Sequence, residues 1–341
     1  MTCRMAIRGI GLVGGFGCGT EAALNALRNG GRPDDFLMLK VPTGTVKYPV
    51  YLANPDPLKK FFSPRKLRRV NKYSQLAVLA ACMALQDAGQ AVYQHLDTGV
   101  IVASGYGAST TTFAFLDDVI LEGDNFASPT LFSNSVHSSA ASHITILLQI
   151  KGPCLTVIQF EMSIIAALLN AQVWLKDKKV DTVLLGGIDE INQVLLYCYY
   201  NFYGKDIPQE MTPLNYELQT AIPGEGAAFM VLTRDEGEIS PYGYIDMVSW
   251  ETSSEHTIPE DILIISGSDG HRTCSLQYRK LLHRMDHTDI KTFSQIYGSM
   301  PCGQMFDLAI ASVAARYGLI TNSYCSIKLD AKGNLGVIHH S

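Results

Sequence analysis

Short apolar runs alternate with segments of helical periodicity along most of the chain. The clearest case is residues 151–188, where an apolar run at 154–157 precedes apolar residues at helical spacing from Ile164 to Leu175 and a second run at 180–185. Runs of about four to eight apolar residues indicate buried strands, and helical spacing indicates a helix packed on one face. Little more than one crossover helix can lie between the two runs, so the segment predicts a parallel strand–helix–strand unit.

Comparable patterns recur on both sides of this unit. The apolar runs predict further strands at residues 6–13, 98–104, 229–232 and 262–265. The spacings predict helices at residues 21–28 and 108–121, and another that ends near residue 88. Residues 32–62 are rich in proline and turn-forming residues, which predicts an irregular crossing of the surface. Strands that alternate with helices are typical of the α/β class.

The turn between the first strand and the helix of residues 151–188 contains Glu161. A side chain in this place is accessible and faces the unpaired N–H groups at the positive end of the helix dipole. Nucleophiles are often placed there. A carboxylate is a poor nucleophile for acyl transfer, because the product would be a mixed anhydride of high energy. It can instead cap the helix, so the residues predict a structural role for Glu161.

Composition excludes several classes of protein. The 341 residues are 47% hydrophobic and 17% charged, which allows one large core or two fused halves. A net charge of −5 without a basic block argues against a nucleic-acid partner. The eight cysteines lack the spacing of a disulfide framework or a zinc site, and no dinucleotide motif is complete, so we expect no metal and no cofactor. Without a membrane-length apolar run or a signal peptide, the expected location is the cytoplasm, with no membrane partner.

Several segments resemble the β-ketoacyl synthase family. GPCLTVIQFEMSIIAALLNA and KVDTVLLGGIDE resemble the family's nucleophile segment, and GIGLVGGFGCGTEAALNALRNG and LRRVNKYSQLAVLAACMALQDAG resemble its opening strand, loop and helices. GVIVASGYGASTTTF, FSNSVHSSAASHI and IPGEGAAFMVL also have counterparts in the family, in the same order. The resemblance implies a thiolase-like fold with α-β-α-β-α layers and two similar halves. These would be residues 1–235 and a shortened half at 236–341.

The positions that carry catalysis in this family are changed here. The resemblance places Glu161 where the family has its nucleophilic cysteine, Asp269 at the first histidine and Ser299 at the second. No lysine lies at the family's place before the second histidine. A decarboxylative condensation needs a thiolate to carry the acyl chain and donors to stabilise the developing negative charge. The resemblance therefore implies a ketosynthase fold without ketosynthase chemistry.

The family includes such a member, the chain length factor of type II polyketide synthases. It pairs with an active ketosynthase subunit and has lost the cysteine, usually to glutamine. The resemblance implies a heterodimer of this kind, which acts on a polyketide chain that the phosphopantetheine of an acyl carrier protein carries. The task of this chain would be to shape the tunnel for the growing polyketide and so to set its length. Glu161 would then be a helix cap or an ion-pair partner across the dimer.

A basic cluster lies at the start of the helix that ends near residue 88. It is formed by Arg65, Lys66, Arg68, Arg69 and Lys72. Such a cluster is commonly a solvated helix face, and its functional interpretation is a docking surface for the acidic carrier protein.

The predicted helix at 108–121 would lie at the dimer interface if the resemblance holds. Ser109, Thr112, Phe113 and Leu116 are spaced so that they lie close to one face of this helix. Ordinary packing explains such a stripe, and the alternative is that these side chains bound the acyl tunnel.

Two other functions use Glu161 directly. One is a decarboxylase or priming subunit that acts on the malonyl carrier protein. The other is a thiolase-fold enzyme in which Glu161 is a base and His271 or His137 a donor. The sequence leaves open whether the product would be an aromatic polyketide or an aryl polyene, and it gives neither chain length nor starter unit.

Overall fold

The computed structural model describes residues 3–33, 35–92, 97–203, 207–252, 262–283 and 289–341. Within them, ten strands form one continuous sheet made of two halves, and the short β2 (Gly17–Cys18) pairs with the end of the central strand β1. The first half contains β1 (Met5–Gly14), β5 (Thr98–Ser104), β6 (Cys154–Ile158), β7 (Thr182–Asp189) and β8 (Gly226–Arg234). The second contains β9 (Tyr244–Thr252), β10 (Leu263–Ser266), β11 (Ile290–Lys291), β12 (Tyr324–Leu329) and β13 (Asn334–His340).

The two halves repeat one topology. Their strands are arranged β6-β5-β7-β8-β1 and β11-β10-β12-β13-β9, which is the order 3-2-4-5-1 in each half. In both, the second strand is parallel to its two neighbours and the remaining pairs are antiparallel. A short pairing of β1 with β9 joins them, with Met5 opposite Ile245. The predicted duplication is confirmed, while the boundary at residue 235, which falls between β8 and β9, stays a prediction.

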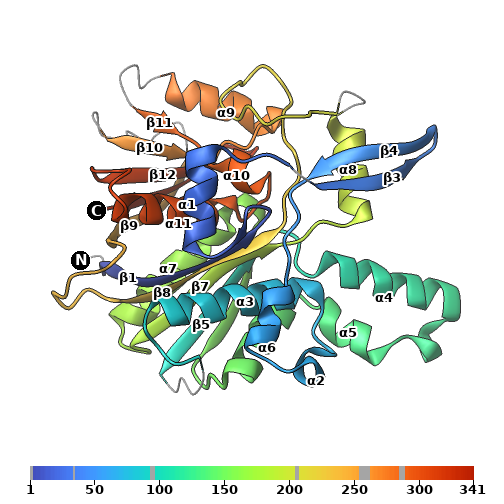
Figure 1. The fold of residues 1–341 in the computed structure, drawn as a ribbon, viewed down its shortest axis with the longest axis horizontal. Coiled ribbons are helices and arrows are strands. Elements are labelled where there is room, and N and C mark those ends of the chain that lie inside the picture. Colours follow the sequence, from blue (N-terminus) through green and yellow to red (C-terminus); the bar gives the residue numbers. More distant parts are fainter. Residues whose placement is uncertain (1–2, 34, 93–96, 204–206, 253–261, 284–288) are drawn as a thin grey trace.

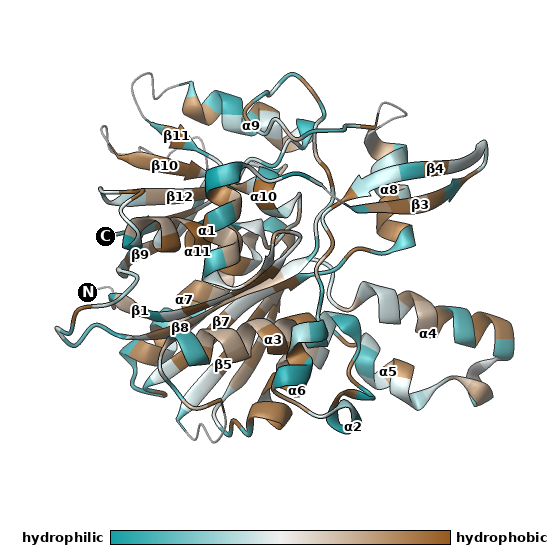
Figure 2. Cartoon of the chain, in the orientation of Figure 1, coloured by the Kyte–Doolittle hydropathy of each residue, from teal (hydrophilic) through white to brown (hydrophobic). Residues whose placement is uncertain are grey.

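Helices cover both outer faces of the halves and fill the space between them (Figure 1). The central helices are α7 (Ser163–Lys176) and α11 (Gly303–Arg316), each of which follows the third strand of its half. Helices α3 (Lys72–Asp87) and α6 (Ser139–Leu148) pack on the outer face of the first half, and α9 (Arg272–Leu282) on that of the second. These are the expected five layers. Much of β10 and of α7 is apolar (Figure 2), as expected for elements covered on both sides.

The second half is short mainly because its first connection is short. Residues 15–97 link β1 to β5 and include α1 (Thr20–Asn29), α2 (Pro64–Leu67) and α3, whereas residues 253–262 alone link β9 to β10. Apart from α4 and α5, which are described below, the other helices within the described residues are α8 (Gln193–Tyr203) and α10 (Ser294–Tyr297), with short 3-10 turns at Asp56–Lys60, Asp124–Phe126 and Phe160–Met162. Among the helices of the described part of the chain, none is both long and apolar enough to span a membrane.

The predicted irregular crossing at 32–62 is wrong in part. Strands β3 (Asp35–Val41) and β4 (Gly44–Val50) form an antiparallel hairpin there. Alternate side chains such as Leu39 and Val41 pack with Leu196 of α8, so an apolar face stabilises the hairpin despite its turn-rich sequence. The predicted position of the basic cluster at the start of the helix is also wrong in part. Only Lys72 lies in α3, because Asn71 caps this helix by accepting a hydrogen bond from the Ser74 amide at 3.0 Å.

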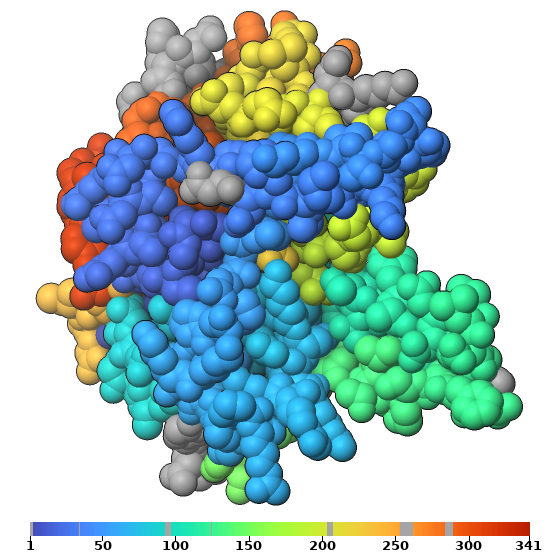
Figure 3. Space-filling view, turned by 45° about the vertical axis from the view of Figure 1, so that its right-hand side comes forward, coloured from blue at the N-terminus to red at the C-terminus, as the bar shows by residue number. Residues whose placement is uncertain are grey.

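Helices α4 (Ser109–Glu122) and α5 (Pro129–Ser135) project from the body of the molecule as a separate lobe. We call residues 109–135 the α4–α5 lobe; it is the green projection in Figure 3. The two helices pack on each other, with the rings of Phe115 and Phe132 centred 5.5 Å apart. Within α4 only Ser109 and Thr111, at its base, are buried. The lobe is therefore attached to the body mainly through its base.

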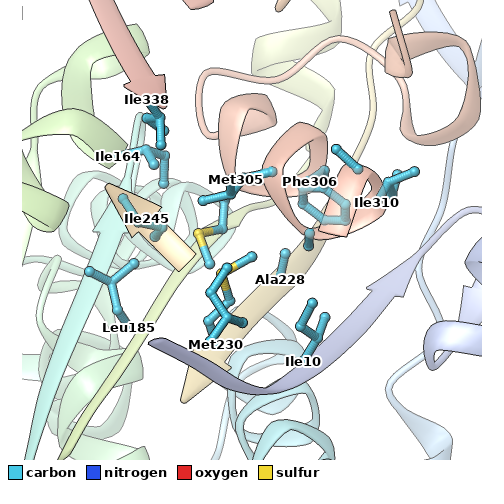
Figure 4. Close-up of a cluster of buried hydrophobic side chains, with 14 of the residues drawn as sticks. Ile10, Ile164, Leu185, Ala228, Met230, Ile245, Met305, Phe306, Ile310 and Ile338 are labelled. Atoms are coloured by element: carbon cyan, nitrogen blue, oxygen red, sulfur yellow. The ribbon is translucent and has the colours of Figure 1, made fainter. Parts of the chain in front are cut away.

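The main core lies where the two central helices meet both halves of the sheet (Figure 4). Met305 and Phe306 of α11, Ile164 of α7 and Met230 of β8 are fully buried there. Each such side chain contributes about 1.5–3 kcal/mol by leaving water. Gly187 of β7 lies directly under this contact, because a β-carbon at that position would lie 2.8 Å from Ile164 and 3.0 Å from Cys302. Glycine is thus required for both central helices to approach the strand.

Candidate functional site

Glu161 lies in the tight turn that leads from β6 into α7. The preceding residue, Phe160, has φ of 48°, a left-handed conformation that costs free energy in a non-glycine residue and is often found at functional turns. Ser163 stabilises the turn, since its Oγ accepts from the Gln159 amide at 2.8 Å and donates to the Ser104 carbonyl at 2.9 Å. Among the described residues no side chain caps α7, whose N-cap residue is Met162. The predicted capping role of Glu161 is wrong, because Met162 takes the N-cap position and Glu161 lies one residue before it in the 3-10 turn.

Asp269 and Ser299, thirty residues apart in the sequence, are in direct contact. Ser299 Oγ donates to Asp269 Oδ2 at 2.8 Å and lies 3.2 Å from the hydroxyl of Tyr199. Asp269 follows β10 and Ser299 follows α10, so the loops after two elements of the second half meet at this point. The structure therefore brings together the two positions that the sequence analysis assigned to histidines.

Lys328 in β12 completes this network, and sequence analysis did not find it. Its side chain is almost fully buried, with Nζ donating to the Gly267 carbonyl at 2.9 Å and lying 3.9 Å from Asp269 Oδ2. Burial disfavours its ammonium form, but Asp269, Glu161 and Asp307 outweigh burial and raise the pKa of Lys328. Lys328 is therefore charged and balances part of the negative charge of three carboxyl groups.

Glu161 faces a different cavity from the side chains around Asp269. It lines a cavity of about 380 Å³ together with Trp250, Asp330 and other residues of the second half. Tyr199 and His271 instead line a cavity of about 720 Å³ between α8 and α9. Burial raises the pKa of Glu161, and the nearby Lys328 ammonium partly offsets this effect. The carboxyl group is thus coupled to the network through charge rather than through a shared cavity.

Chemically, the centre consists of carboxyl groups, hydroxyl groups and one ammonium group. Burial lowers the pKa of His271 to about 4, so its imidazole is neutral near pH 7. Cys302, at the start of α11, is fully buried, and burial keeps the pKa of its thiol well above the ordinary value. Nothing among the described residues of the centre supplies a reactive thiolate.

Asp307 in α11 is the most deeply buried carboxyl group near this centre. Its Oδ1 accepts from the Tyr297 hydroxyl at 2.8 Å, and burial raises its pKa to about 7. The pKa in the folded state exceeds the ordinary 3.8, so stability falls as the pH rises from 3.8 to about 7. We expect Asp307→Asn to remove about 1–3 kcal/mol of the difference in unfolding free energy between pH 5 and pH 8.

Urea denaturation at the two pH values measures this difference. Asp117→Asn is the matched control, because Asp117 is exposed on α4. A pH dependence that stays unchanged in Asp307→Asn would contradict the assignment.

The four candidate tunnel residues lie in different environments. Ser109 Oγ accepts from the Asn192 side chain at 2.7 Å, and Thr112 Oγ1 donates to the Ala108 carbonyl at 2.9 Å. Phe113 is half-buried, and Leu116 is exposed on the outer part of the lobe. The two hydroxyl groups thus attach the base of α4, whereas Leu116 is free to contact another molecule. That any of them bounds a tunnel stays a prediction.

The α4–α5 lobe carries an exposed apolar surface, visible at the outer end of α4 in Figure 2. Its most exposed large side chains are Ile120, Leu121, Phe126 and Phe132. Contiguous apolar surface of this kind marks sites of protein association. The lobe surface is therefore a candidate interface.

The basic cluster is solvent-accessible on α2 and the turn after it. Arg65, Lys66, Arg68 and Arg69 are all exposed. The Arg69 carbonyl also accepts from the Asn134 side chain of α5 at 3.0 Å, so the cluster lies next to the lobe. Its use as a carrier docking surface stays a prediction.

The repeated five-strand halves, the two central helices and the outer helix layers define a thiolase-like ketosynthase fold. The family described as "Beta-ketoacyl synthase, N-terminal domain" matches residues 40–237, and this chain belongs to the β-ketoacyl synthase family. The "Putative polyketide beta-ketoacyl synthase 1" of Streptomyces cyaneus is 26% identical over 246 residues, which is 68% of this chain and 58% of that protein. The chain thus matches less than two thirds of that relative.

Two solved structures share the fold over nearly the whole chain. One is a type II polyketide synthase ketosynthase in complex with its acyl-carrier protein, with a TM-score of 0.75 and 13% identity over 100% of this chain and 99% of that chain. The other is the ishigamide ketosynthase/chain length factor, with a TM-score of 0.74 and 14% identity over 98% of each chain. At these identities the comparison concerns the fold alone.

Proposed function

We propose that this chain is a catalytically inactive ketosynthase-like subunit that pairs with an active β-ketoacyl synthase and helps to set chain length in type II polyketide synthesis. The observation that carries the proposal is the contact of Asp269 with Ser299 beside the buried Lys328. The two residues that the resemblance places at the family's histidines bond to one another, and neither of them carries an imidazole. The centre is used to stabilise the fold.

The missing chemistry supports the same conclusion. Condensation through an acyl-enzyme requires a thiolate, and Glu161 at the nucleophile position would form an unstable anhydride instead. His271 is neutral and lines a different cavity from the one that Glu161 lines. The two side chains are therefore poorly placed to act as donor and base on one substrate. A partner subunit must then supply the reaction.

The surface of the chain offers contacts for such partners. The apolar α4–α5 lobe is suited to an obligate heterodimer, whose interfaces typically bury more than about 2,000 Å² and are apolar. The basic cluster at Arg65–Arg69 is suited to an acidic carrier protein. The similarity in fold to a ketosynthase/chain length factor is consistent with this arrangement.

Co-expression with the active ketosynthase and the carrier protein tests the proposal. We expect Leu116→Trp to shorten the products, because a larger side chain on the exposed face of α4 would reduce the space available to the growing chain. We expect Glu161→Ala to leave synthesis intact. Mass analysis of the products measures both effects, and Leu319→Trp is the matched control, since Leu319 is about as exposed but lies after α11.

The outcome for Glu161→Ala separates this proposal from its alternative. Glu161 lines an open cavity and its pKa is raised, which are properties of a general acid or base. Loss of product in Glu161→Ala, with the complex still assembled, would show that this chain performs a chemical step such as decarboxylation of the malonyl carrier. The claim of catalytic inactivity would then be wrong.

A further inference from the structure

The base of the α4–α5 lobe is attached to the body by polar contacts rather than by apolar packing. Three consecutive residues at the start of α4 bind side chains of the body. The contacts are Ser109 Oγ with Asn192 Nδ2 at 2.7 Å, Thr110 N with Glu190 Oε1 at 2.8 Å, and Thr111 Oγ1 with Asn71 Nδ2 at 2.9 Å, while Thr112 Oγ1 donates to the Ser135 carbonyl at 3.0 Å within the lobe. The position of the lobe therefore depends on these bonds.

The contact of Glu190 differs from the others because Glu190 can change its charge. Its carboxylate accepts from the Thr110 amide at the N-terminus of α4, where the helix dipole favours a negative charge. Charge-assisted hydrogen bonds are roughly twice as strong as neutral ones. Loss of the charge would weaken the attachment of α4 at the point where the lobe meets the body.

The surroundings of Glu190 allow its carboxylate to take up a proton near neutral pH. Glu190 is 4% exposed and Glu225 is fully buried, while one ammonium group, that of Lys72, pairs with Glu225. Burial, together with the charge of Glu225, raises the pKa of Glu190 to about 7.

The remaining ionisable groups around this site do not replace Lys72 as a counter-charge. Asp189 accepts from the amides of Gly105 and Cys302, both at 2.8 Å, and so uses its charge elsewhere. The phenol of Tyr73 on α3 and the thiol of Cys302 are buried, and burial raises the pKa of both well above the ordinary values, so they are neutral. Two carboxyl groups thus share one ammonium group, and Glu190 is the one without an ion pair among the described residues.

We propose that Glu190 is a proton-sensitive positioning residue, which holds the α4–α5 lobe as a carboxylate and loosens it on taking up a proton from solvent. The attachment is expected to tighten as the pH rises through neutrality. That the lobe contacts a partner and the polyketide chain rests on the proposed function. The proton-dependent attachment itself does not.

Hydrogen–deuterium exchange of the full chain tests the attachment directly. After correction for the intrinsic effect of pH, the peptide that contains the Thr110 amide should exchange roughly tenfold faster at pH 6 than at pH 8. Glu190→Gln carries a neutral side chain of the same shape, so its exchange should be fast at both pH values. Glu122→Gln, at the exposed end of the same helix, should match the parent protein.

Global stability separates positioning from a purely structural role. Removing a buried charge should leave the urea midpoint of Glu190→Gln at pH 8 equal to or above that of the parent, although its α4 exchanges faster. Two results would overturn the proposal. One is a corrected exchange rate of the parent protein that does not change with pH, and the other is a pH dependence in Glu190→Gln like that of the parent. If Glu190→Gln does not fold, the pH profile of the parent alone decides. Should the lobe loosen as expected while product length stays unchanged in the complex, the proposed function fails and the proton-dependent attachment stands.

Discussion

Lys328→Met should lower the free energy of unfolding by about 3–5 kcal/mol, the largest effect that we expect from a single substitution in the centre. The side chain of Lys328 is 4% exposed, and its Nζ lies 3.9 Å from Asp269. Methionine has a similar volume, so the change removes the charge with little change in packing. Asp269, Glu161 and Asp307 would then share a buried site without the ammonium group that balances them.

Urea denaturation near neutral pH measures this loss. Lys332→Met is the control, because Lys332 is exposed in the turn after β12. The double variant Lys328→Met with Asp269→Asn should regain much of the loss, since it removes both charges of the pair. A wild-type midpoint in Lys328→Met would show that the ion pair is not what holds the centre together.

Under the proposed function, Leu121→Arg should weaken assembly with an active ketosynthase about 100-fold, the size of effect expected at an interface hot spot. Leu121 is 78% exposed on α4, so the substitution leaves the fold of this chain intact. In the complex it would place an unpaired charge in an apolar contact. Titration of the labelled ketosynthase with each variant, followed by fluorescence anisotropy, gives the dissociation constants.

Ile239→Arg is a stringent control for this effect. Ile239 is 92% exposed but lies between β8 and β9, away from the lobe. Equal weakening in both variants would indicate a general effect of added positive charge. Unchanged binding in Leu121→Arg would exclude the outer face of α4 from the interface.

Much of the fold could be predicted from local sequence patterns. The unit at 151–188 was predicted in the right order and direction, because alternation between strand and helix spacing is strong there. The structure adds that β5 lies between β6 and β7, so these two strands are not neighbours. That arrangement depends on contacts between distant segments, which periodicity does not encode.

The centre was predictable only in part, for a similar reason. Glu161, Asp269 and Ser299 were found through the resemblance, and the structure shows that Asp269 and Ser299 touch. Lys328 was missed, although one signal was available: it is a lysine in the otherwise apolar or small run Tyr324–Leu329. A charged residue in a buried strand requires a partner, but the identity of that partner depends on the fold.

The hairpin β3–β4 and the base of the lobe show a second limit. The many turn-forming residues of the hairpin hid its alternation of apolar and polar side chains from sequence analysis. The apolar face is stabilised by contact with α8, which the local sequence does not predict. Ser109 and Thr112 were grouped with Phe113 and Leu116 by spacing alone. The hydrogen bonds that distinguish them come from segments that lie far away in the sequence.

The identical strand order of the two halves has an evolutionary consequence. Each half has a connection between its third strand and its central helix. It contains Glu161 in the first half, and α10, Ser299 and Cys302 in the second. An ancestral duplication of one unit would make these two connections equivalent. Their side chains can be exchanged while every strand keeps its register. A duplicated scaffold of this kind can therefore keep its strand order while the side chains of its connections change.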